Sequence, residues 1–323
     1  MLAAIPINDP YYYKEIFRFR TFFPSPSDGT VLTNCGMNLE EYFKRISSYE
    51  ALDLPTLKMI HKRHVMSIPF ENLSIHCGER ITTDLQVIFD KVVRGRRGGW
   101  CMENNLLFGW VLREMGYDTT TLGARVFSAS SQDFFPYESH LINKVIIDGK
   151  PHIADVSFGM SSQVWEPLEL ISGKDQPQAA GIFRLIEKGD VWMLEKTARK
   201  PEFLNPECAK SSLINRNLTR LVYCFSLSPR QVEDFSDINH KLQTTPTSLF
   251  TNKSICSLQT ATGFKGLVGW TYSEVTYKPE EGVDVFSMRD ITEEEIEEVL
   301  REQFNVVLQN KVQPFFTFCY STH

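Results

Sequence analysis

The chain contains 323 residues, of which 42% are hydrophobic and 23% charged, and its formal net charge is −6. At ~100–200 residues per domain this length allows two or three compact units, and the apolar content excludes a chain that is disordered throughout. The acidic balance argues against a general binder of nucleic acid or anionic membranes, and no apolar run approaches the ~18–20 residues that cross a bilayer.

Residues 1–36 differ from the rest of the chain because proline-rich turns surround an aromatic and basic patch with no sustained periodicity. We therefore expect a loosely attached N-terminal extension. An organelle presequence is the alternative, although Asp9, Glu15 and Asp28 disagree with the acid-poor composition of such segments.

Apolar residues at helical spacing then predict four helices before Gly116. The predicted helices cover residues 39–46, 54–64, 87–94 and 100–115. Thr83 and Gln86 form a capping-box pattern before the third helix, and Gly95 and Gly116 are placed to end the third and fourth helices.

After Gly116 the apolar residues follow the spacing of strands, and turns at Asp148-Gly149 and Gly189-Asp190 separate some of them. The predicted strands cover residues 119–127, 141–147, 151–156, 181–186, 191–197, 221–227, 255–260, 266–272 and 283–288. A short helix at 231–242 and a last helix that begins near Thr292 complete the pattern. This order of helices, a β-rich middle and a smaller mixed piece predicts an α+β protein of several domains.

The seven cysteines are widely spaced and include no C-x-x-C pair, so the sequence encodes neither a zinc knuckle nor a dithiol redox motif. The N-terminus also lacks the order of a secretory signal. We expect reduced thiols, a cytoplasmic location and no bound metal.

One cysteine, Cys101, follows a glycine-rich turn at Gly98-Gly99 and begins a predicted helix. The unpaired N–H groups of a first helical turn act as about half a positive charge, which stabilises a thiolate. The pattern is compatible with a nucleophile, and equally with a buried structural cysteine behind a flexible connector.

A base and its acceptor are available on the next two strands. A two-residue type I′ turn at Asp148-Gly149 pairs Asp155 with Ile142, so His140 and Asp155 become diagonal neighbours on one face, roughly 7–8 Å apart. A three-residue turn would put them on opposite faces instead. The order Cys101, His140, Asp155 is that of a thiol acyl-transfer triad.

The other histidines have weaker patterns. His61 and His64 could bind a metal, but Lys62 and Arg63 lie between them, and we expect a solvated helix face. His152 is predicted to point away from Asp155.

Five motifs identify a family. They are residues 67–73 (SIPFENL), 97–101 (RGGWC), 154–159 (ADVSFG), 165–178 (WEPLELISGKDQPQ) and 256–260 (CSLQT). These motifs resemble the arylamine N-acetyltransferases, and the last two resemble the vertebrate branch. The resemblance covers about residues 37–323.

The resemblance implies an architecture like that of papain-type thiol enzymes. Its parts would be a helical bundle at 37–116, a β-barrel at 117–225, an interdomain segment at 226–261 and an α/β lid with tail at 262–323. It also implies ping-pong transfer from acetyl-CoA, through an acetyl-cysteine at Cys101, to arylamines, arylhydrazines and N-hydroxyarylamines. His140 and Asp155 match the family's catalytic positions, and the N–H of Met102 would help hold the oxyanion.

The resemblance also implies binding residues. The positions that match acceptor-pocket walls are Val126, Phe127, Phe158 and Met160. The positions that match coenzyme A contacts are Thr247, Ser248 and Tyr320, although relatives carry a smaller hydroxyl residue at the last.

Further expectations concern the surroundings of the triad. Asn105 lies one turn after Cys101 and could hydrogen-bond near the triad or simply lie on the helix surface, and Arg97 is expected to pair with Glu71. A papain- or transglutaminase-like hydrolase and a catalytically idle relative are the alternative functions.

Overall fold

The computed structural model describes residues 36–47 and 52–312. The predicted extension at 1–36 therefore lies outside the described residues except for Gly36, and Tyr320 lies outside them too. Backbone contacts group Met37–His323 into one compact unit.

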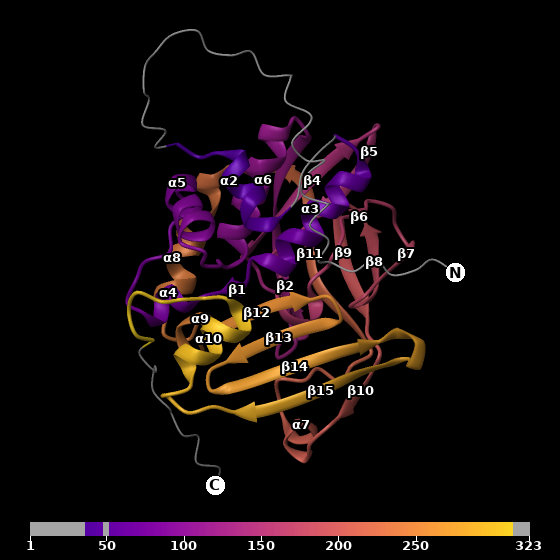
Figure 1. Cartoon of the computed structure of the whole chain (residues 1–323). Coiled ribbons are helices and arrows are strands. Elements are labelled where there is room, and N and C mark those ends of the chain that lie inside the picture. Colours follow the sequence, from indigo (N-terminus) through magenta and orange to yellow (C-terminus); the bar gives the residue numbers. More distant parts are fainter. Residues whose placement is uncertain (1–35, 48–51, 313–323) are drawn as a thin grey trace, which may run out of the picture. The chain divides into compact units, whose positions relative to one another are not determined.

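The first half of this unit is helical, as the spacing of apolar residues predicts (Figure 1). Its elements are α2 (Leu39–Ile46), α3 (Leu54–Ser67), α4 (Leu73–His76), α5 (Leu85–Phe89), the π-helical turn η1 (Asp90–Arg94) and α6 (Cys101–Met115). Asn38 and Asp53 cap α2 and α3 with side-chain oxygens that accept N–H donors of the first turn. Gly116 ends α6 with φ of 98°.

The third predicted helix differs from the structure in two ways. Its N-cap is Asp84 rather than Thr83, because the Asp84 carboxylate accepts the N–H of Val87 at 3.0 Å. Only five residues are α-helical before the chain widens into η1, which ends at Gly95. A π-turn inserts one residue into the hydrogen-bond ladder, and this shift turns Lys91 toward α6.

A nine-stranded, nearly closed antiparallel barrel follows the helices. Its order is β6-β5-β4-β2-β11-β9-β8-β7, with β3 paired to β2. The strands are β2 (Asp118–Ser128), β3 (Asp133–Phe134), β4 (His140–Ile147), β5 (Lys150–Ala154), β6 (Leu168–Glu169), β7 (Asp175–Gln178), β8 (Gly181–Lys188), β9 (Val191–Thr197) and β11 (Thr219–Pro229). The 3₁₀ turn η2 (Met160–Ser162) connects β5 to β6.

A mixed six-stranded sheet contains most of the C-terminal strands, and its strands β12 to β15 are orange to yellow in Figure 1. Its order is β1 (Phe70–Glu71), β12 (Ile255–Thr260), β13 (Gly263–Val268), β14 (Thr271–Lys278), β15 (Val283–Asp290) and β10 (Lys200–Phe203). The remaining helical elements are α7 (Pro206–Lys210), η3 (Val232–Phe235), α8 (Ser236–Thr244), α9 (Leu249–Asn252), η4 (Pro279–Glu281) and α10 (Ile296–Phe304).

The single strand predicted at 266–272 is wrong. The structure has two strands there, β13 and β14, and a tight turn at Gly269 with φ of 58° separates them. The apolar run continues through the turn because Leu267 and Tyr272 pair across the hairpin, and both pack under α10. Because the apolar residues continue through the turn, the sequence pattern did not indicate that the chain reverses direction there.

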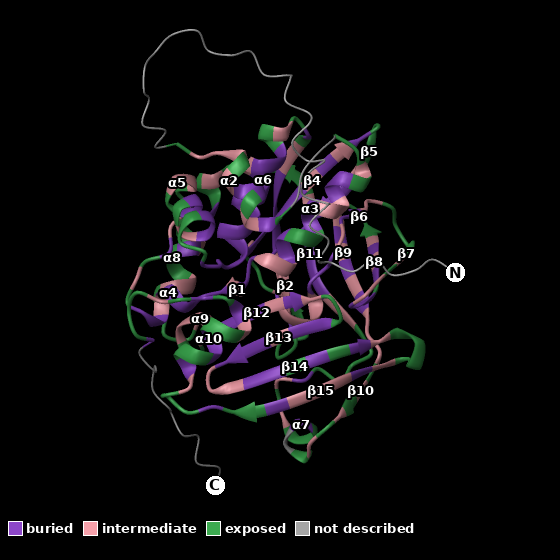
Figure 2. Ribbon diagram, in the orientation of Figure 1, coloured by how far each residue is buried: buried purple, intermediate pink, exposed green. Residues whose placement is uncertain are grey.

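The core is built around α6, whose apolar side chains are buried against the barrel, as the purple ribbon in Figure 2 shows. Leu106, Leu107 and Phe108 are at most 1% exposed, and each such side chain contributes about 1.5–3 kcal/mol by burial. Gly109 lets α6 approach β4, because a Cβ there would meet the Asn143 side-chain oxygen at 2.6 Å. Gly109→Ala would therefore push the helix away from the barrel.

Among the described residues, no helix has both the length and the apolar character needed to cross a membrane.

Candidate active site

Cys101 is the first residue of α6, as the sequence predicts. Trp100 precedes the helix with extended backbone, and its N–H donates to the Glu103 carboxylate at 3.1 Å. The thiol is 5% exposed, and its Sγ lies 3.6 Å from the Ser139 carbonyl oxygen, one residue before β4. The helix start thus directs the cysteine at the beginning of the strand that carries His140.

The hairpin between β4 and β5 has the predicted type I′ geometry. Asp148 and Gly149 both have positive φ, 50° and 72°, and Asn143 pairs with Ala154. This register is the predicted one, and it is extended by Asp155, which lies directly after β5. The two-residue turn therefore places His140 and Asp155 on the same side of the hairpin.

His140 and Asp155 form a buried pair, with 2.8 Å between His140 Nε2 and Asp155 Oδ2. Burial lowers the pKa of His140, but the Asp155 charge and hydrogen bond, together with a hydrogen bond to Cys101, outweigh it and raise the pKa to about 10. Because Nε2 faces Asp155, the other ring nitrogen is left for Cys101. The three side chains predicted as a triad therefore lie in contact in the structure.

Asn105 holds the second oxygen of Asp155. Its Nδ2 donates to Asp155 Oδ1 at 2.9 Å and to the Leu141 carbonyl at 2.8 Å, while its Oδ1 accepts the Val156 N–H at 2.9 Å. Asn105 is fully buried and so is not part of the helix surface. Burial raises the pKa of Asp155, but His140, Asn105 and the N–H of Ser157 lower it below its usual range.

The prediction of a solvated histidine face on α3 is wrong. One of its two histidines, His61, hydrogen-bonds to the backbone of Asp155. His61 and His64 are both fully buried. His61 Nε2 accepts the Asp155 N–H at 3.2 Å, so Nδ1 carries the proton and donates to the Trp165 carbonyl at 2.9 Å. Burial lowers the pKa of His61 to about 4, which keeps the ring neutral at pH 7.

The expectation failed because the side chains at 61 and 64 lie on the opposite side of α3 from exposed Lys62 and Arg63. His64 Nδ1 and the Tyr42 hydroxyl are hydrogen-bonded at 2.8 Å, and the His64 ring makes a T-shaped contact with the Phe108 ring. Three-residue spacing on a helix was the signal that the two histidines share a face. The sequence did not indicate the partners of these histidines, because those of His61 are backbone groups more than 90 residues away and that of His64 is Tyr42 on α2.

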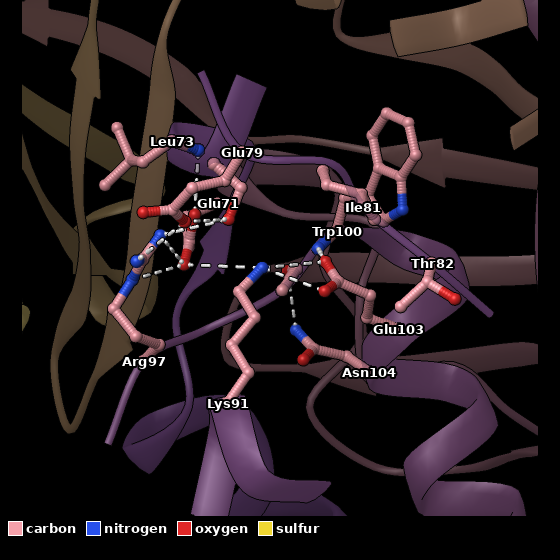
Figure 3. Close-up of polar contacts among 12 residues, drawn as sticks. Glu71, Leu73, Glu79, Ile81, Thr82, Lys91, Arg97, Trp100, Glu103 and Asn104 are labelled. Carbon is pink, nitrogen blue, oxygen red and sulfur yellow. Dashed lines mark hydrogen bonds and ion pairs between the residues drawn. The ribbon is translucent and has the colours of Figure 1, made fainter. Parts of the chain in front are cut away.

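A second buried network surrounds Trp100 and Glu103 at the start of α6 (Figure 3). Lys91 Nζ meets the two Glu103 oxygens at 2.8 and 3.1 Å, and Glu71 Oε1 at 3.8 Å. Arg97 meets Glu71 at 2.9 Å, so the predicted Arg97–Glu71 pair is confirmed. The Glu103 carboxylate then accepts the Trp100 N–H. These three ion pairs connect η1 and β1 to the turn that precedes Cys101.

Two aromatic rings pack against the buried His140 imidazole. The Phe158 ring lies edge-on to His140 with centroids 5.2 Å apart, and the Tyr223 ring lies at 5.2 Å on another side. Phe127 on β2 stacks edge-on with Phe134 at 5.3 Å and is half-buried, as is its neighbour Val126.

Met160 begins η2 with φ of 48°, and its N–H donates to Ser257 Oγ at 3.2 Å. Through this contact and the Gln259 amide, which donates to the Met160 carbonyl at 2.9 Å, η2 is anchored on β12 of the C-terminal sheet. The segment after Phe158 therefore has a fixed backbone.

The described candidates for coenzyme A contacts lie before α9. Thr247 is exposed, and Ser248 is the N-cap of α9, with Oγ accepting the Phe250 N–H at 3.2 Å. Asn72 Nδ2 donates to the Phe250 and Lys253 carbonyls, each at 2.9 Å, which ties α9 to the turn after β1.

Comparison with known proteins adds to this geometry. The chain matches the N-acetyltransferase family model over residues 53–313. It is 50% identical over 281 residues to "Arylamine N-acetyltransferase, pineal gland isozyme NAT-10" of Gallus gallus, covering 86% of this chain and 97% of that protein. It is 44% identical over 289 residues to "Arylamine N-acetyltransferase 1" of Homo sapiens, covering 87% of this chain and all of that protein (100%).

Solved structures agree with the fold. The Mycobacterium smegmatis arylamine N-acetyltransferase superposes with a TM-score of 0.73 at 26% identity, over 86% of this chain and 97% of that one. The Mycobacterium marinum enzyme, solved in complex with CoA, superposes with a TM-score of 0.70 at 26% identity, over 83% and 93% of the two chains.

Proposed function

Because the chain belongs to the arylamine N-acetyltransferase family, we propose that it acetylates arylamines, arylhydrazines and N-hydroxyarylamines from acetyl-CoA by a ping-pong mechanism. Cys101, His140 and Asp155 are the proposed catalytic residues. The observation that carries this proposal is the buried His140–Asp155 pair at 2.8 Å, with Cys101 on the other side of the imidazole.

In the first half-reaction, the Cys101 thiolate attacks the thioester carbonyl carbon of acetyl-CoA. The new C–S bond forms as the carbonyl π electrons move to oxygen, and we propose that the N–H of Met102, in the first turn of α6, donates to that oxyanion. The tetrahedral intermediate then expels the CoA thiolate, which leaves with the proton of the His140 imidazolium. The products are acetyl-Cys101 and free CoA.

In the second half-reaction, the amine nitrogen of the acceptor attacks the acetyl carbon. His140 is now neutral and accepts the proton that the amine loses, while the C–S bond breaks and returns a thiolate beside an imidazolium. Asp155 holds Nε2 throughout, so the ring keeps the orientation in which Nδ1 faces the sulfur.

The acceptor ring is proposed to lie against Phe158, Val126, Phe127 and Met160. The edge-on contact of Phe158 with His140 supports this placement, because a flat ring stacked there would bring its amino group to the imidazole. Thr247 and Ser248 are proposed to contact CoA, and Tyr320 keeps this role as a prediction outside the described residues.

The test is the intact mass of the protein after incubation with acetyl-CoA alone. We expect an increase of about 42 Da, the mass added by one acetyl group, and loss of that mass with product formation when an arylamine is added. Cys101→Ser should show neither, while Cys77→Ser, a matched change at a buried thiol of α4's C-cap, should behave as the parent chain does.

Acetylation that persists in Cys101→Ser would refute the assigned nucleophile. An acetyl group that is released only to water, without an acetylated amine, would instead support a thiol hydrolase with the same triad. The observed identity to arylamine N-acetyltransferases favours transfer to the amine.

A further inference from the structure

A hollow lies between the barrel and the C-terminal sheet, and none of the three proposed catalytic residues lines it. It encloses about 510 Å³ of atom-free space, part of it open to solvent. Residues of η2, β9, β11, β14 and β15 line it, together with the chain around Ile214.

The charges around this hollow are unbalanced. The ionisable side chains among its described lining residues are Lys196, Arg199, Arg220 and Asp284. Three cations therefore face one carboxylate, and Arg199 already engages that carboxylate at 2.6 Å. Two positive side chains are left without an acidic partner.

Lys196 is the more deeply buried of the two. It is 1% exposed, and its Nζ donates to the Ser161 carbonyl and lies 5.6 Å from the centre of the Phe183 ring. No carboxylate among the described residues lies within ion-pair distance of it. Burial, with Arg220 and Arg199 as further causes, lowers the pKa of Lys196 well below its usual range.

Arg220 on β11 reaches the same place. Its Nη2 donates to Ser161 Oγ at 2.9 Å and to Ser162 Oγ at 3.1 Å, and it also has no carboxylate partner in the described part of the chain. The two serine hydroxyls can rotate and donate to a third group, because a hydroxyl is both acceptor and donor.

Burial without a counter-charge disfavours the charged form of a basic side chain, and a bound anion would restore the protonated Lys196 ammonium beside the Arg220 guanidinium. The donors available are one ammonium, one planar guanidinium and two hydroxyls, which together suit the oxygens of a phosphate or carboxylate. We propose that this hollow is a binding site for a small oxyanion, held between Lys196 and Arg220.

The position of the site gives it a structural consequence. Ser161 and Ser162 belong to η2, which follows Phe158, the ring that contacts His140. An anion bound to Arg220, Lys196 and these hydroxyls would tie η2 to the barrel, adding to its anchor on β12.

The test uses the full chain and inorganic phosphate, measured by titration calorimetry and thermal unfolding against sodium chloride of the same ionic strength. We expect saturable binding and a rise in Tm of about 2–4 °C at ten times the Kd. Parallel titrations with acetate and benzoate identify the source: tighter binding of phosphate assigns a phosphate group, and tighter binding of a carboxylate assigns a carboxylate.

Lys196→Met should weaken binding at least tenfold while keeping the fold, since an apolar chain of similar length replaces a buried charge. Arg220→Gln should weaken it similarly, and Lys188→Met, at an exposed lysine of β8, should not change it. Cys101→Ser should bind the anion as the parent does, which separates this proposal from the proposed catalysis. Absence of saturable binding for all three anions, or unchanged binding in Lys196→Met, would overturn it.

Discussion

The ion pair between Lys91 and Glu103 offers a test of how the start of α6 is stabilised (Figure 3). The change is Lys91→Met, which keeps an unbranched chain of similar length and removes only the ammonium. Glu103 would then lose the partner that its two oxygens meet at 2.8 and 3.1 Å. Its remaining donor among the described contacts is the Trp100 N–H.

The size of the effect follows from burial. Breaking a buried ion pair by removing one partner costs about 3–5 kcal/mol, because the other charge stays in a medium of low polarity. The Glu103 side chain is 3% exposed but that of Lys91 is 15% exposed, so we expect the lower limit, about 3 kcal/mol of unfolding free energy. Burial already raises the pKa of Glu103, and protonation without Lys91 limits the loss.

The assay is urea unfolding at pH 7, followed by tryptophan fluorescence, with acetyl transfer measured on the same samples. Lys44→Met is the matched control, because Lys44 and Glu40 form an ion pair at 3.0 Å with both side chains more than 70% exposed. Its expected loss is below about 1 kcal/mol.

The double variant Lys91→Met/Glu103→Gln separates charge from shape. A neutral amide at 103 can still accept the Trp100 N–H, so we expect it to recover at least half of the stability that the single variant loses. A loss for Lys91→Met no larger than that for Lys44→Met would refute the reasoning, as would a double variant less stable than the single one.

Three other predictions concern the histidines and Asp155. Asp155→Asn should lower acetyl transfer by about 10⁴ without unfolding the chain, and a loss below tenfold would remove Asp155 from the mechanism. His61→Phe should cost about 1–3 kcal/mol and reduce kcat more than KM by leaving the Asp155 N–H without its acceptor, whereas exposed His240→Phe should change neither. Nitrogen-15 NMR at pH 7 should show His140 protonated on both nitrogens and His61 neutral. The raised pKa of His140 means that its charged form contributes folding stability fully below about pH 6.5, and this contribution is lost as the pH rises through about 10. The lowered pKa of His61 has the opposite effect: its neutral form contributes stability above about pH 6.5, and this contribution is lost as the pH falls through about 4.

Much of the site could be predicted because local rules determine it. A glycine-rich turn before an apolar period places Cys101 at a helix start, and Asp148-Gly149 permits only a narrow set of hairpins. The second rule fixes the register of β4 and β5, and with it the side on which His140 and Asp155 lie. Local sequence patterns were therefore sufficient to predict that Cys101, His140 and Asp155 lie close together.

The residues that hold the triad could not be predicted in this way. His61 contacts Asp155 across 94 positions, and the partners of its ring nitrogens are backbone groups, which every residue has. Lys91 meets Glu103 from within the π-turn η1, and helix propensities do not distinguish that turn from an α-helix. The spacing of Asn105, one helical turn after Cys101, indicated that it could lie near the triad. That spacing did not indicate whether Asn105 lies on the helix surface or in the core, where the structure has it.

The charges near the sulfur are arranged in pairs that cancel. Lys91 neutralises Glu103, Arg97 neutralises Glu71, and Asp155 is matched by protonated His140, so none of these pairs leaves a net charge behind the nucleophile. The proposed nucleophile Cys101 therefore meets no net charge from these pairs, and the directional groups beside it are the His140 ring on one side and the first-turn N–H groups of α6 on the other. A Glu103 carboxylate paired with the Lys91 ammonium, only two residues after Cys101, is therefore compatible with the proposed thiolate chemistry.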